Sequence, residues 1–147
     1  MSKIELEFYL KRGVIDLESI DDDAIRQTIL HVKSLVKNAE FDRAIGNLPP
    51  LFFEWVWSNG DGDPEDCFSD IEDISVVLSA SNSRIRLGVT DDDLIISINV
   101  SFVVSLKDNV EKNEVQEWLD LNSMVYAGFV SGGWSYHNDE GSGVRVV

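Results

Sequence analysis

Residues 94–106 alternate between apolar and mostly small polar side chains along the whole segment. Leu94, Ile96 and Ile98 begin the apolar set, while Ser97 and Asn99 begin the polar one. A period of two is typical of a β-strand with one buried face and one solvent-facing face. A strand in a parallel sheet covered on both sides would be apolar throughout. The segment therefore predicts an antiparallel sheet that is wet on one side.

Shorter segments with the same alternation predict the remaining strands. They lie at residues 4–10, 51–57, 74–80, 85–89 and 125–129. We also expect a last hairpin, in which 134–137 pairs with 144–147 around a polar loop.

Two segments have the spacing of amphipathic helices. The first follows an N-cap at Asp21 or Asp22 and is predicted over about residues 22–38. The second is predicted over about residues 110–122, after a capping box formed by Asp108 and Glu111.

The order β-α-β-β-β-β-α-β-β predicts one α+β domain over residues 1–147. We expect a twisted antiparallel sheet of about five to seven strands, with two helices packed on one face. A length of 147 residues and a hydrophobic content of 44% suit a folded domain with its own core.

Charge limits the partners that such a domain can bind. The chain has 27 acidic residues against 12 lysines and arginines, a formal net charge of −15. This field repels nucleic acids and anionic lipids, and it attracts basic proteins. We therefore expect a basic protein partner, one that handles nucleic acid, and no direct contact with nucleic acid or a membrane. The lone Cys67, and the lack of a signal peptide or an apolar span, predict a cytoplasmic protein.

The acidic residues are most concentrated where basic residues are missing. No lysine or arginine occurs between Arg43 and Arg84, and a run of like charge destabilises a fold unless it is solvated or used. We expect the acids of this stretch to bind the basic partner. Trp134, which follows a Gly-Gly pair, is expected to be an exposed aromatic anchor for the same partner. The predicted partner-binding residues are Asp61, Asp63, Glu65, Asp66, Asp70, Glu72, Asp73 and Trp134.

Two acidic triplets have simpler interpretations. Residues 21–23 suit a helix N-terminus, where carboxylates interact favourably with the helix dipole. Residues 91–93 suit a hairpin turn between two strands.

The segment 59–70 is also a weak candidate for a metal site. Asn59, Asp61, Asp63 and Asp70 occupy positions 1, 3, 5 and 12 of a calcium-binding loop. The match fails at position 6, where Pro64 replaces the required glycine. We expect no metal and no cofactor.

No catalytic motif is present, and Cys67 has acidic neighbours that raise the pKa of its thiol, so we expect no enzyme. The leading hypothesis is a small acidic inhibitor of the immunity type, such as an antidote to a nuclease toxin or a phage protein acting as a DNA mimic against a restriction or CRISPR complex. One alternative is a non-enzymatic, self-associating structural or accessory domain. A second is a divalent-cation-binding protein that uses the 59–70 loop.

Overall fold

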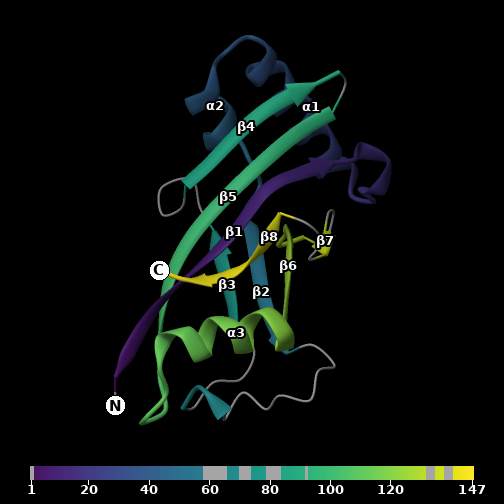
Figure 1. Cartoon of the computed structure of the whole chain (residues 1–147). Coiled ribbons are helices and arrows are strands. Elements are labelled where there is room, and N and C mark those ends of the chain that lie inside the picture. Colours follow the sequence, from purple (N-terminus) through teal and green to yellow (C-terminus); the bar gives the residue numbers. More distant parts are fainter. Residues whose placement is uncertain are drawn as a thin grey trace.

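The computed structural model describes residues 2–57, 66–69, 74–78, 84–91, 93–131, 135–137 and 141–147. The described strands form two four-stranded antiparallel sheets, named sheet A (β4-β5-β1-β8) and sheet B (β3-β2-β6-β7) (Figure 1). The strands are β1 (Lys3–Ile15), β2 (Leu51–Trp57), β3 (Ile74–Leu78), β4 (Arg84–Thr90), β5 (Asp93–Ser105), β6 (Ser123–Phe129), β7 (Ser135–His137) and β8 (Ser142–Val146). The helices are η1 (Leu17–Ser19), α1 (Asp23–Lys37), α2 (Phe41–Gly46) and α3 (Lys112–Asn122).

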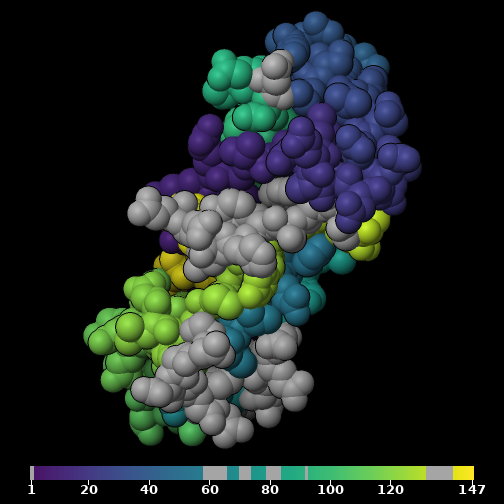
Figure 2. Space-filling model, turned by 90° about the vertical axis from the view of Figure 1, so that its right-hand side faces the viewer, coloured from purple at the N-terminus to yellow at the C-terminus, as the bar shows by residue number. Residues whose placement is uncertain are grey.

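This arrangement confirms the α+β class and the antiparallel pairing. The strands are divided between two sheets instead of forming one, and the two longer helices lie at opposite ends of the molecule (Figures 1 and 2). Helix α1 packs against β4, whereas α3 packs against β8 and β6. The physical reason is that one apolar face of the long strands β1 and β5 is too extensive for the helices alone, so sheet B covers part of it.

The two sheets meet through aromatic side chains. Phe8 of β1 and Phe53 of β2 stack with ring centroids 4.4 Å apart and planes inclined by 2°. Phe102 of β5 packs against Phe53 and Trp55 at 5.7 and 5.8 Å. The buried hydrophobic side chains form one continuous cluster that includes these rings. Full burial of each large side chain contributes about 1.5–3 kcal/mol.

Strand β1 continues beyond its predicted end because of a β-bulge. Leu10 pairs with Ile98 and Gly13 pairs with Ile96, so two residues of β1 lie opposite the single residue Ser97. The extra residue shifts the alternation by one position, and Gly13 and Ile15 therefore stay on the buried face. The sequence pattern breaks at this point, which is why alternation alone predicts a strand that ends at Leu10.

The predicted C-terminal hairpin is wrong. Strand β7 pairs with β6 in sheet B, whereas β8 pairs with β1 in sheet A. Strand β7 pairs with the strand just before it in the sequence, whereas the partner of β8 lies at the other end of the chain, and local alternation does not reveal which partner a strand takes.

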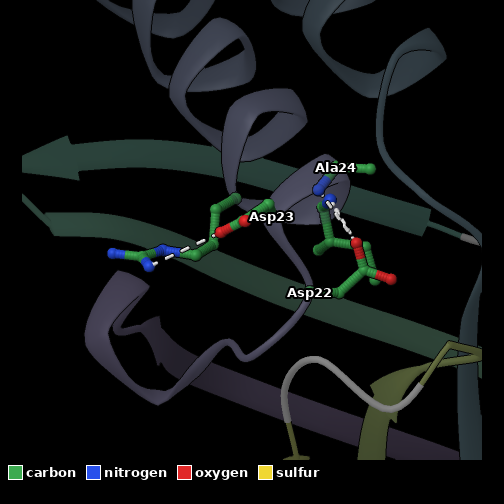
Figure 3. Close-up of polar contacts among 5 residues, drawn as sticks. Asp22, Asp23 and Ala24 are labelled. Carbon is green, nitrogen blue, oxygen red and sulfur yellow. Dashed lines mark hydrogen bonds and ion pairs between the residues drawn. The ribbon is translucent and has the colours of Figure 1, made fainter.

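The helix starts are nearly as predicted. The side chain of Asp22 caps α1 by accepting hydrogen bonds from the backbone N–H groups of Ala24 and Ile25, at 2.9 and 3.2 Å (Figure 3). The capping box of α3 lies three residues later than predicted. It joins Glu111 to Glu114, and the backbone N–H of Glu111 donates to the Glu114 carboxylate at 3.0 Å.

Within the described part of the chain, none of the helices has the length and apolar character needed to cross a membrane.

Candidate functional site

Of the predicted partner-binding residues, Asp66 alone lies in the described part of the chain. The others fall outside it: Asp61, Asp63, Glu65, Asp70, Glu72, Asp73 and Trp134. The weak metal candidates Asn59, Asp61, Asp63 and Asp70 also lie outside the described residues. Among the residues that are described, no group of three or more His, Cys, Asp or Glu side chains is placed to hold a metal ion.

Asp66 belongs to a short segment, residues 66–69, that is fixed to the end of β5. The backbone N–H of Lys107 donates to the carbonyl oxygen of Cys67 at 2.9 Å, and that of Ser69 donates to the carbonyl oxygen of Ser105 at 3.2 Å. Phe68 forms an isolated β-bridge with Leu106. These contacts fix the segment that carries Asp66 to the end of β5.

The 66–69 segment packs on the aromatic core through Phe68. Phe68 is 1% exposed and packs edge-on against Trp55 and Trp118, with centroid distances of 5.5 and 5.6 Å. Trp57 joins the same cluster, 4.9 Å from Trp118. Trp55 is fully buried, and Trp57 is partly buried against the cluster.

Helix α3 contributes two further carboxylates beside Asp66. Its inner face buries Val115, Trp118 and Leu119. Glu114 and Glu117 are exposed, and with Leu121 they are spaced at intervals of three and four, which places them along one stripe of the helix.

These residues line a pocket of about 310 Å³ between α3 and the 66–69 segment. The walls are Asp66, Cys67, Val110, Glu114, Glu117, Trp118, Leu121 and Asn122. Three carboxylates therefore surround a largely apolar floor, and none of the described lining residues is a lysine or arginine. We call this site the α3 acidic pocket.

The thiol of Cys67 reports on the electrostatics of the α3 acidic pocket. Burial raises the pKa of this thiol, and the negative charges of Asp66 and Glu114 raise it further. The expectation that acidic neighbours raise the pKa is confirmed, and burial adds a larger effect. A thiol of this kind is a poor nucleophile at neutral pH.

Two properties of the α3 acidic pocket suit a long cationic side chain. An arginine or lysine can lay its methylene stem on apolar surface such as Val110 and Leu121 while its charged head reaches a carboxylate. Leu121 is 69% exposed, which is a high value for a leucine on an amphipathic helix.

Sequence reasoning missed Glu114 and Glu117, because exposed acids on a helix usually form a solvated face. A signal was present in the apolar residue Leu121, which shares their stripe at a position where a solvated face is polar.

The acidic triplets take the simpler roles. Asp22 caps α1, and Asp23 lies 3.9 Å from Arg26 in an exposed ion pair (Figure 3). Asp91 occupies the turn between β4 and β5 with a φ of 53°, a conformation that Asp and Asn tolerate better than most residues.

A scan of protein-family models and searches of curated proteins and of solved structures find no match to this chain.

Proposed function

We propose that this protein is a small acidic inhibitor of the immunity type, which binds and blocks a basic protein that handles nucleic acid. The class of target is a toxin nuclease or a defence complex. The observation that carries the proposal is the α3 acidic pocket, where three carboxylates surround apolar surface and no basic residue is found among the described lining residues.

The negative charges of Glu114 and Glu117 are available to a partner. Glu114 and Glu117 form no ion pair with a lysine or arginine among the described residues. Elsewhere, Arg26, Arg43 and Arg145 pair with Asp23, Glu40 and Glu7 in positions that solvent reaches. Such surface pairs add at most about 1 kcal/mol each. The long-range field of −15 charges then accelerates encounter with a basic surface.

The mechanism of inhibition is occupation of phosphate-binding groups. An arginine that normally holds a phosphate can bind a carboxylate through two parallel hydrogen bonds. Each such pair contributes about 1.5–3 kcal/mol when shielded from water, or roughly a 10- to 150-fold change in Kd. In this proposal the acids predicted from sequence between residues 61 and 73 supply further carboxylates that mimic phosphates. The protein acts in the cytoplasm, without a cofactor and without chemistry of its own.

The test is capture of the partner from extracts of the source cell at low salt, with tagged wild-type protein as bait. We expect a strongly basic, nucleic-acid-handling protein that elutes as NaCl is raised, and whose activity on nucleic acid falls when the complex forms. A stable homo-oligomer with no basic partner, seen by sedimentation, would favour the self-associating alternative. Heat of binding in calorimetry with millimolar calcium would favour the divalent-cation alternative.

A further inference from the structure

A second pocket, on the solvent-facing side of sheet A, has the opposite charge. It has a volume of about 250 Å³ and is lined by Leu10, Lys11, Arg84, Arg86, Ser97 and Asn99. Three of the chain's 12 basic residues thus meet in one place, and none of the described residues that line the pocket is a carboxylate. We call this site the sheet A basic pocket.

The register of the strands explains how these side chains meet. Arg84 pairs with Asn99, and Arg86 pairs with Ser97, across the β4–β5 ladder. The two arginines are two residues apart on one strand, so they point to the same side at a spacing of about 6.5–7 Å. Strand β5 supplies the polar floor, and β1, its other neighbour, supplies Lys11.

The β-bulge of β1 brings Lys11 to this site. The hydroxyl of Ser97 donates to the carbonyl oxygen of Lys11 at 2.5 Å, and the backbone N–H of Lys11 donates to the carbonyl oxygen of Gly141 at 2.6 Å. The bulge is therefore bonded to β5 on one side and to Gly141, the residue before β8, on the other. Bulges often redirect a side chain at a functional site.

The three cations of the pocket have no acidic partner in the part of the chain that the structure describes. Among the described residues, Lys11, Arg84 and Arg86 form no ion pair, although acids outnumber basic residues 27 to 12 in the whole chain. Like charges gathered on adjacent strands repel each other, and a bound anion removes that repulsion. Charged residues on an edge strand also guard against aggregation, which accounts for the two arginines of β4. That role does not account for Lys11, which comes from a strand in the interior of the sheet.

We propose that the sheet A basic pocket binds the phosphate group of a small phosphorylated molecule. Two arginine guanidinium groups match the geometry of phosphate oxygens, and the lysine adds a third positive charge. The side-chain amide of Asn99 offers a neutral hydrogen-bond donor on the floor of the pocket, whereas the hydroxyl of Ser97 already donates its proton to the Lys11 carbonyl. The site is independent of the α3 acidic pocket and of the inhibitor function proposed above.

The test is an NMR titration of the full chain at constant ionic strength, with inorganic phosphate in one arm and adenosine 5′-monophosphate in the other. We expect saturable shifts of the backbone amides of Lys11, Arg84, Arg86 and Asn99. Tighter binding of the monophosphate ester identifies a nucleotide-like ligand, and equal binding identifies the phosphate group alone as the determinant.

A charge-matched pair of variants separates a specific site from general attraction. The R84Q/R86Q double variant is expected to weaken phosphate binding at least about tenfold, or 1.4 kcal/mol. The K107Q/K112Q control removes the same charge from exposed positions outside the pocket and should leave Kd within about twofold. K11Q tests the bulge residue without altering the edge strand. Equal losses in both double variants, or shifts that never saturate, would overturn the proposal.

Discussion

Replacing Phe8 and Phe53 with leucine, singly and together, measures how strongly the two sheets hold each other. Both side chains are almost fully buried, at 1% and 0% exposure, and their rings stack at 4.4 Å. Leucine keeps most of the apolar volume, so each single change should cost about 1–2 kcal/mol, less than the 3–5 kcal/mol of a change to alanine. A stacked aromatic pair contributes about 0.5–1.5 kcal/mol beyond its buried area. The double variant should therefore lose less than the sum of the singles by about that amount.

The assay is urea unfolding followed by tryptophan fluorescence, with the free energy of unfolding extrapolated to water. A matched control combines Phe53→Leu with Asp22→Ala at the cap of α1, where the two costs should add to within about 0.5 kcal/mol. Strict additivity in the Phe8 and Phe53 cycle would refute the packing of sheet A on sheet B.

Three further predictions follow from the caps, the thiol and the net charge. Asp22→Ala should lower the free energy of unfolding by about 1 kcal/mol, and Asp21→Ala, which removes no cap, by much less; chemical denaturation measures both. Glu114→Gln should lower the pKa of Cys67 and speed its alkylation at pH 8, while Glu117→Gln should leave the rate unchanged. Because the thiol's pKa is higher in the folded state, its contribution to stability is present below the unfolded pKa of about 8.5 and is lost as pH rises through the folded value. Adding about 0.5 M NaCl should raise Tm, since salt screens the repulsion among 27 acids; a fall in Tm would contradict net self-repulsion.

Alternation and capping chemistry predicted most elements, because both act locally. The segment 94–106 forms β5 almost as predicted, and Asp22 caps α1 as one of two candidates. The division into two sheets was not predictable in this way, since alternation identifies a buried face but not what covers it. The second half of β1 was not predicted, because the bulge at Lys11 shifts the alternation of buried and exposed residues by one position.

In the candidate site too, local sequence patterns predicted some residues, and only the fold revealed the others. Asp66 could be predicted as a candidate site residue because the sequence itself shows an acidic run without basic residues. Glu114 and Glu117 lie far from that run in sequence and join it through the packing of α3 beside Cys67. The sheet A basic pocket was also invisible, because Lys11 and Arg84 are brought together only by strand order.

The most direct test of the inhibitor proposal is the salt dependence of affinity for the captured basic partner. The Glu114→Gln/Glu117→Gln variant keeps the capping box, because glutamine also serves at that position. Its control, Asp91→Asn/Asp93→Asn, removes two exposed charges from the β4–β5 turn, and asparagine accepts the positive φ of Asp91. We predict that wild-type affinity falls steeply between about 50 and 200 mM NaCl, and that the α3 variant loses at least about tenfold in Kd and shows a shallower slope. Affinity that is indifferent to salt, or equal losses in the variant and its control, would contradict the proposal that the α3 acidic pocket binds a basic protein.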